Sequence, residues 1–203
     1  MKRIYKLISI IFHPILLPLV ATLIFFIIDQ PILDNQIKYR LLIIIGTATY
    51  LIPIVLLALL KKRKLIQSFE VKGIQERKIP ILFMIVLFFF LGKTLISIDE
   101  IFFLSILFLG SSLSLCVCYF TFIKNQKTSL HMIGIASLLA FIILYSITTH
   151  KNLLPLIAII FIIAGIIAYA RIKLKAHTLT EINLGFIIGF VSQVILYLNS
   201  INV

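Results

Sequence analysis

Seven apolar runs, separated by short polar stretches, account for most of the chain. Each run is about as long as the roughly 20 residues that a helix needs to cross a bilayer. No run shows the alternation of apolar and polar residues that a membrane β-barrel requires. The pattern therefore predicts an all-α polytopic transmembrane bundle of about seven spans (six to seven), forming a single domain over residues 1–203. The runs cover about residues 7–28, 41–60, 79–98, 101–123, 131–148, 153–170 and 180–198.

The start of the first run and the boundary between the third and fourth runs each allow two interpretations. The run at 7–28 follows Met1-Lys2-Arg3 as in a signal peptide, but it is too long for a signal sequence and is predicted to be the first retained span. Only Asp99-Glu100 separates the third run from the fourth. This spacing predicts a tight hairpin, with a re-entrant segment as the alternative.

Prolines and glycines inside the runs predict irregular helices and close helix packing. Pro14, Pro18 and Pro53 lack the N–H that a helix interior uses, so the first two spans should be kinked or leave carbonyl groups free. His13, a rare polar side chain inside such a run, either serves a function or satisfies backbone groups freed by Pro14. In the last run, glycines four residues apart favour close contact with a neighbouring helix.

Composition supports the membrane assignment and argues against nucleic-acid binding. The chain is 62% hydrophobic and 13% charged, about half the charged fraction of ordinary soluble domains. The net charge of +12 comes from basic residues that flank the apolar runs, which is typical of membrane orientation. Cys116 and Cys118 lie within one apolar run and are interpreted as core residues rather than metal ligands or a disulfide.

Basic residues concentrate at the N-terminus and in the segments after the second, fourth and sixth runs, which hold 15 of the 19. The positive-inside rule then predicts a cytoplasmic N-terminus and an outside C-terminus. These 15 residues are Lys2, Arg3, Lys6, Lys61, Lys62, Arg63, Lys64, Lys72, Arg77, Lys78, Lys124, Lys127, Arg171, Lys173 and Lys175.

Three polar clusters on this predicted side carry the chemistry. They are the segments 72–80, 127–131 and 170–181. Together they offer two histidines, two arginines, lysines, a serine and two carboxylates. An arginine side chain can donate two parallel hydrogen bonds to phosphate oxygens, and hydroxyl groups and the N–H groups of helix N-termini add further donors. The set is therefore suited to holding a phosphate and attacking its phosphorus.

The spacing within these clusters resembles the type 2 phosphatidic acid phosphatase and vanadium haloperoxidase superfamily. Arg171, five residues, His177, three residues and Glu181 match its third motif, Ser-Arg-x5-His-x3-Asp. The segment 128–131 resembles its second motif, Pro-Ser-Gly-His, and 72–80 loosely resembles its first, Lys-x6-Arg-Pro. The resemblance extends over about residues 72–190, with a family-like core at about 72–198.

The chain also departs from the family pattern in ways that bear on the site. Ala170 replaces the serine, Glu181 the aspartate, Leu130 the glycine and Thr128 the proline. In the first motif, the lysine at 72 lies five rather than seven residues before the arginine.

The resemblance implies a metal-independent lipid phosphatase without cofactor. His177 would attack phosphorus, Glu181 would hold its other ring nitrogen, and His131 would protonate the leaving alkoxide. The phosphoryl oxygens would be bound by Arg171, Arg77, Lys72 and Ser129. Expected substrates are phosphatidate, phosphatidylglycerophosphate or a polyprenyl diphosphate, and the expected location is a bacterial inner membrane.

Simpler interpretations of the same residues stay open. Thr178 and Glu181 form a helix capping box, which accounts for the carboxylate without catalysis. Ser129 or Thr128 fits a cap of the fifth span, and the basic residues Arg171, Lys173 and Lys175 fit interfacial anchors. The alternative functions are an inactive family member that binds anionic lipid or a membrane partner, and a small transporter.

Overall fold

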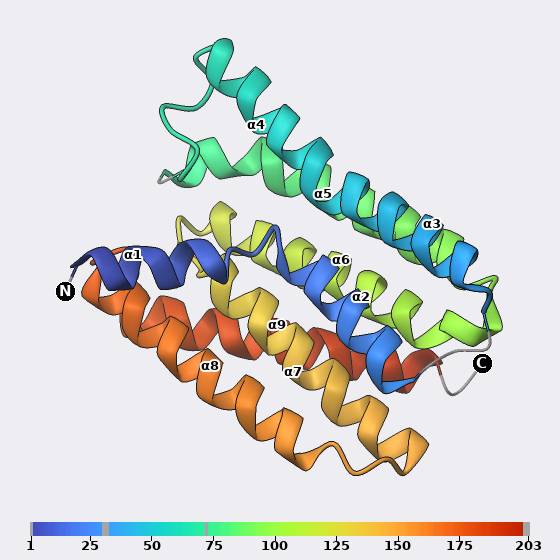
Figure 1. The fold of residues 1–203 in the computed structure, drawn as a ribbon. Coiled ribbons are helices and arrows are strands. Elements are labelled where there is room, and N and C mark those ends of the chain that lie inside the picture. Colours follow the sequence, from blue (N-terminus) through green and yellow to red (C-terminus); the bar gives the residue numbers. More distant parts are fainter. Residues whose placement is uncertain (1, 30–32, 72, 201–203) are drawn as a thin grey trace.

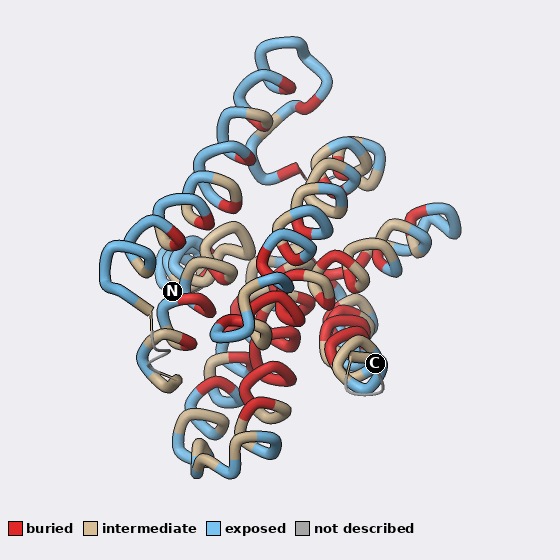
Figure 2. Tube along the Cα trace, turned by 90° about the vertical axis from the view of Figure 1, so that its right-hand side faces the viewer, coloured by how far each residue is buried: buried red, intermediate tan, exposed pale blue. Residues whose placement is uncertain are grey.

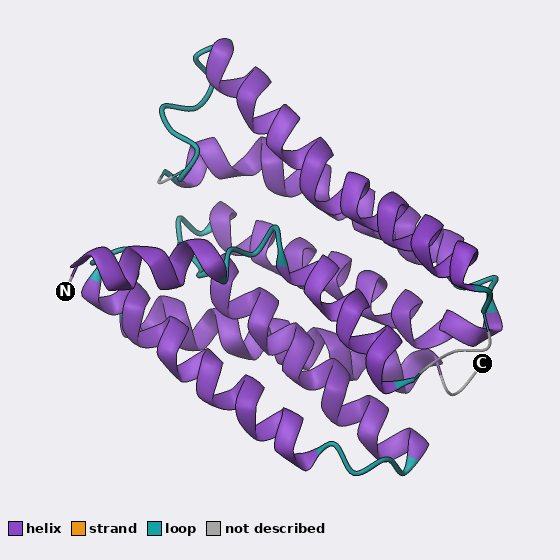
Figure 3. Cartoon of the chain, in the orientation of Figure 1, coloured by secondary structure: helices purple, strands orange, loops and turns teal. Residues whose placement is uncertain are grey.

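The computed structural model describes residues 2–29, 33–71 and 73–200, and these residues form helices and loops without a β-strand (Figure 1, Figure 3). This confirms the all-α class. The helices are α1 (Lys2–Ile11), α2 (Leu17–Ile28), α3 (Asn35–Gly46), α4 (Ile52–Lys62), α5 (Ile74–Leu95), α6 (Phe102–Ile123), α7 (Leu130–Thr149), α8 (Leu154–Lys173) and α9 (Leu179–Ser200).

Six helical segments in the described residues are long and apolar enough to cross a membrane. They correspond to the second to seventh apolar runs. The first run is not a continuous span. Its second half, α2, has 12 residues, fewer than a crossing needs. The six segments are Asn35–Lys62, Ile74–Leu95, Asp99–Ile123, Leu130–Thr149, Leu154–Lys173 and Leu179–Ser200.

The first run is interrupted at residues 12–16, between α1 and α2. Pro14 has no backbone N–H and pushes the residue before it, His13, out of the helical region, so α1 ends at Ile11. The chain resumes through a turn in which the Leu16 N–H donates to the His13 carbonyl (2.9 Å). α1 and α2 then follow one another from one end of the bundle to the other (Figure 1).

The second run contains the irregularity that Pro53 predicts. A π-helical turn at Thr47–Leu51 joins α3 to α4. Pro53 cannot donate to the carbonyl four residues earlier, and its ring would clash with that carbonyl in a regular helix. The wider turn removes this conflict, and the Thr49 hydroxyl donates to the Ile45 carbonyl nearby (2.8 Å).

The third and fourth runs form the predicted tight hairpin. α5 and α6 pack side by side, joined by a 3-10 turn at Asp99–Ile101. At Gly92 the helices are so close that an added Cβ would lie 2.6 Å from the Leu109 side chain. No re-entrant segment is needed to account for this turn.

α7 lies at the centre of the core, against α2, α6, α8 and α9. Figure 2 shows buried positions gathered in the middle of the bundle and exposed positions around it. The glycine pair of the last run makes the predicted close contact. A Cβ at Gly189 would lie 2.3 Å from the carbonyl oxygen of Ile133, and one at Gly185 would lie 2.7 Å from that of Ser129. The two cysteines are free, Cys118 buried and Cys116 half-buried.

An ion pair between Lys151 and Asp29 holds α2 at the end of the bundle opposite the polar clusters. The Lys151 ammonium donates to the Ile28 carbonyl (2.9 Å) and to the Asp29 carboxylate (3.2 Å). The hydroxyl of Tyr145, on α7, also donates to Asp29. These contacts hold the C-terminal end of α2 against α7.

The three predicted polar clusters come to one end of the bundle. The loop before α5, the turn between α6 and α7, and the turn between α8 and α9 all lie at the left in Figure 1. The N-terminal helix α1 lies at the same end, packed along α8 with Tyr5 and Tyr169 in edge-to-face contact (5.7 Å between ring centroids).

Candidate functional site

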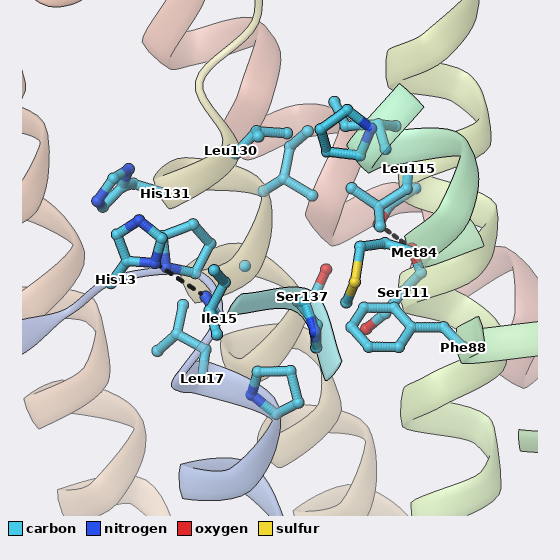
Figure 4. Close-up of a pocket in the computed structure, with 18 of the residues that line it drawn as sticks. His13, Ile15, Leu17, Met84, Phe88, Ser111, Leu115, Leu130, His131 and Ser137 are labelled. Carbon is cyan, nitrogen blue, oxygen red and sulfur yellow. Dashed lines mark hydrogen bonds between the residues drawn. The ribbon is translucent and has the colours of Figure 1, made fainter. Parts of the chain in front are cut away.

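A cavity of about 180 Å³ opens between α2, α4, α5, α6 and α7. Most of its wall is hydrocarbon and proline, and its ionisable groups gather at the end of the bundle that holds the polar clusters. Figure 4 shows this wall, with His13 and His131 beside apolar side chains. The ionisable side chains that line it are His13, Glu70, Arg77, His131, Arg171 and His177.

His177 and Glu181 form the pair that the sequence predicts. His177 lies in the turn before α9, and its Nδ1 is 2.7 Å from Oε2 of Glu181. The same carboxylate accepts from the Thr178 N–H (3.4 Å), while the Thr178 hydroxyl accepts from the Glu181 N–H (3.3 Å). The capping box and the histidine contact therefore coexist, and the helix start holds the carboxylate in place.

The surroundings of His177 favour its neutral form. Burial, with the charges of Arg171, Arg77 and Lys127, lowers the pKa of His177 to about 2. A neutral ring that donates Nδ1–H to a carboxylate keeps a lone pair on Nε2. His177 therefore has an unprotonated ring nitrogen in the cavity wall at neutral pH.

Arg77 joins two of the polar clusters beneath the cavity. Its Nε donates to the Val71 carbonyl (2.8 Å), and its NH1 donates to the Thr128 carbonyl (3.2 Å). The side chain is buried. Within the described residues these bonds use two of the five guanidinium donors, which leaves others to bind an anion.

Arg171 and His131 meet at Ser9 of α1. The Arg171 NH1 donates to the Ser9 hydroxyl (2.5 Å), and His131 Nε2 lies 3.0 Å from the Ser9 carbonyl oxygen. Because a carbonyl only accepts, Nε2 of His131 carries a proton and Nδ1 is free to take part in proton transfer. The Arg171 Nε is buried and has no hydrogen-bond partner among the described residues.

Ser9 is a site residue that sequence reasoning did not identify. It contacts two predicted site residues, yet it lies 162 residues from Arg171 and 122 from His131. Its only sequence signal is a small polar side chain within an otherwise apolar and basic helix.

The remaining predicted residues lie beside the cavity or outside the described part of the chain. Ser129 is fully buried next to the site, and its hydroxyl has no partner among the described residues, but it is not part of the cavity wall. Lys127 donates from Nζ to the Ala176 carbonyl (2.9 Å), and burial and Arg77 lower its pKa. Lys72 lies outside the described residues.

No group of three His, Cys, Asp or Glu side chains within residues 2–29, 33–71 and 73–200 is arranged to hold a metal ion. The polar end of the cavity combines a neutral histidine, a second histidine with a fixed tautomer, and two arginines. This arrangement can bind an anion and attack it.

Six membrane-length apolar helices are the architecture of an integral membrane protein, and the site adds a largely apolar cavity with histidines and arginines at its polar end. Comparison of the chain with protein-family models, with curated proteins and with solved structures finds no match.

Proposed function

We propose that this protein is a membrane phosphatase that hydrolyses a phosphomonoester or pyrophosphate of a lipid through a phosphohistidine. The observation that supports this most is the placement of His177, held by Glu181, in the wall of a cavity that also exposes His131, Arg77 and Arg171. These are the groups that an in-line attack on phosphorus requires.

In the first step, the Nε2 lone pair of His177 attacks phosphorus and the bond from phosphorus to the leaving oxygen breaks. The carboxylate of Glu181, at Nδ1, stabilises the positive charge that develops on the ring. His131 takes up a second proton on Nδ1 beside the bound phosphate dianion and gives that proton to the leaving oxygen, while Nε2–H stays on the Ser9 carbonyl. The products are a lipid alcohol and the phosphohistidine.

In the second step, water attacks the phosphohistidine. His131 takes a proton from this water on Nδ1, the bond from phosphorus to nitrogen breaks, and inorganic phosphate leaves. Both histidines return to their starting protonation states, so the cycle needs no further reactant.

The two arginines and the apolar wall account for binding. Free N–H groups of Arg77 and the unpartnered Nε of Arg171 suit the phosphoryl oxygens, on which negative charge increases in the transition state. The hydrocarbon wall beyond them suits the lipid chain, which makes phosphatidate, phosphatidylglycerophosphate and polyprenyl diphosphate candidate substrates.

The test is phosphate release by the purified protein in detergent, on those three lipids, with His177→Ala as the control. We expect release from at least one lipid and a rate for His177→Ala lower by at least about 1,000-fold, since removing a nucleophile abolishes the covalent route. Equal release by the variant contradicts the proposal. Binding of the lipids without release by the wild type would instead favour an inactive lipid-binding protein.

A further inference from the structure

His13 occupies the break between α1 and α2, and its half-buried ring lines the cavity. The backbone N–H of Ile15 donates to Nδ1 of this ring (3.3 Å), as the dashed line in Figure 4 shows. The break between α1 and α2 thus places the His13 ring in the cavity wall, and this hydrogen bond holds it there.

This hydrogen bond decides the tautomer of His13. A nitrogen that accepts an N–H carries its lone pair there, so the neutral ring has its proton on Nε2. Nε2 has no hydrogen-bond partner among residues 2–29, 33–71 and 73–200. His13 therefore presents one N–H donor that the protein leaves unused.

The neighbour of this donor is His131. The two rings are in edge-to-face contact, with centroids 5.5 Å apart and planes at 77°. Ser9 holds Nε2 of His131, which leaves Nδ1 as the nitrogen that exchanges a proton. Both rings also line the same cavity, so a single bound group can meet both of them.

The position of His13 along the cavity indicates which oxygen of a bound substrate it would contact. Figure 4 shows His131 on one side of the His13 ring and the apolar side chain of Leu17 on the other. In a lipid phosphate the ester oxygen likewise joins the charged phosphoryl group to hydrocarbon. The boundary at His13 matches that oxygen.

We propose that His13 is a further catalytic residue, whose neutral Nε2–H donates to the leaving oxygen while His131 supplies the proton. The inference rests on the phosphatase function proposed above. A neutral donor at this point stabilises the negative charge that the oxygen gains as its bond to phosphorus breaks. His13 keeps its own proton throughout, so its protonation does not change in the reaction.

The test compares two variants on two substrates. His13→Leu removes the donor, whereas His13→Gln supplies an uncharged N–H that cannot titrate. Phosphatidate has a poor alkoxide leaving group, and p-nitrophenyl phosphate has a good one that needs little help. His150→Asn, at the exposed far end of α7, is the matched control.

We expect His13→Leu to lower kcat/KM by about 30-fold on phosphatidate and by less than about 3-fold on p-nitrophenyl phosphate, since the donor acts on the leaving oxygen. His13→Gln should stay within about 5-fold of the wild type on both substrates, because it keeps an N–H donor. The acid and base limbs of the pH profile should be unchanged in His13→Gln.

Equal losses on both substrates, or a thermal midpoint that falls in parallel with the rate, would show a structural role and overturn the inference. So would a glutamine variant as slow as the leucine variant, because that result requires a titrating ring. If the wild type and His13 variants are equally active while His177→Ala is inactive, the inference fails and the proposed function stands. A wild type without activity on either substrate overturns both.

Discussion

The backbone N–H of Ser129 donates to the carbonyl oxygen of Glu181 (3.2 Å), so the start of α7 is bonded to the start of α9. The Lys127 ammonium adds a second bond between the same turns, to the Ala176 carbonyl. The second and third polar clusters are thus hydrogen-bonded to each other. A change in the support of one histidine is therefore expected to displace the other.

Substitution of Glu181 should distinguish its role in the helix cap from its role as the partner of His177. Glutamine can replace glutamate at the third position of a capping box but carries no charge. We expect Glu181→Gln to lower kcat by roughly 100-fold, because a charged partner of the nucleophilic ring is lost. Its thermal midpoint should match the wild type.

Glu181→Ala is the comparison for the cap itself. It should lose the activity and also about 1 kcal/mol of stability, the usual contribution of a helix cap. Phosphate release and thermal melts in detergent measure the two effects. Full activity in Glu181→Gln would assign the carboxylate to the helix cap alone.

Gly189 should be intolerant of even one methyl group. A Cβ there would lie 2.3 Å from the Ile133 carbonyl oxygen, which forces α7 and α9 apart. Gly189→Ala should cost about 1–3 kcal/mol, the usual cost of overpacking.

Gly165→Ala is the matched control, because an added Cβ there meets nothing within 4 Å. It should be neutral or stabilising by up to about 1 kcal/mol, since alanine favours helix more than glycine does. Thermal midpoints of the two purified variants decide the question. Equal midpoints would contradict the close approach of α7 and α9.

The lowered pKa of His177 predicts a pH-dependent stability. Between its folded value of about 2 and the ordinary value near 6.5, the unfolded chain binds a proton that the folded protein does not. Stability should therefore fall as pH falls below 6.5, and the contribution from this residue between pH 7.5 and 5.5 is about 1 kcal/mol.

His177→Asn removes this titration, so the difference in thermal midpoint between variant and wild type should shift in favour of the variant as pH falls from 7.5 to 5.5. Melts of both proteins in the same buffers measure it. A difference that is constant over this pH range would show that His177 titrates normally in the folded state.

The charge asymmetry predicts that the site lies on the cytoplasmic side of the membrane. Gln126 is exposed in the turn between α6 and α7, next to the site. With Cys116 and Cys118 replaced by alanine, a cysteine at Gln126 should resist an impermeant thiol reagent in intact cells and react after permeabilisation. Labelling in intact cells would place the site on the outer face.

Local sequence signals predicted the six long spans and the His177–Glu181 pair. The spans follow from apolar length, which the bilayer sets. The pair follows from a spacing of four residues across a helix start, where the turn itself brings the side chains together. Pro53 predicted the irregularity in the second run for an equally local reason.

The place of Ser9 in the site and the interruption of the first apolar run could not be predicted in this way. Apolar length alone indicated one span over 7–28, whereas Pro14 divides it and leaves α1 packed along α8. The contacts of Ser9 with His131 and Arg171 depend on that packing. Such contacts arise from tertiary structure, and no spacing in the sequence encodes them.

The Ser9–Arg171 hydrogen bond has a consequence for biosynthesis. A membrane protein is made and inserted from its N-terminus, and 162 residues separate these two partners. His177 is made later still. A chain that has inserted only through α7 lacks both Arg171 and His177, so the proposed hydrolysis of bilayer lipids would await the translation of α8 and the turn that follows it.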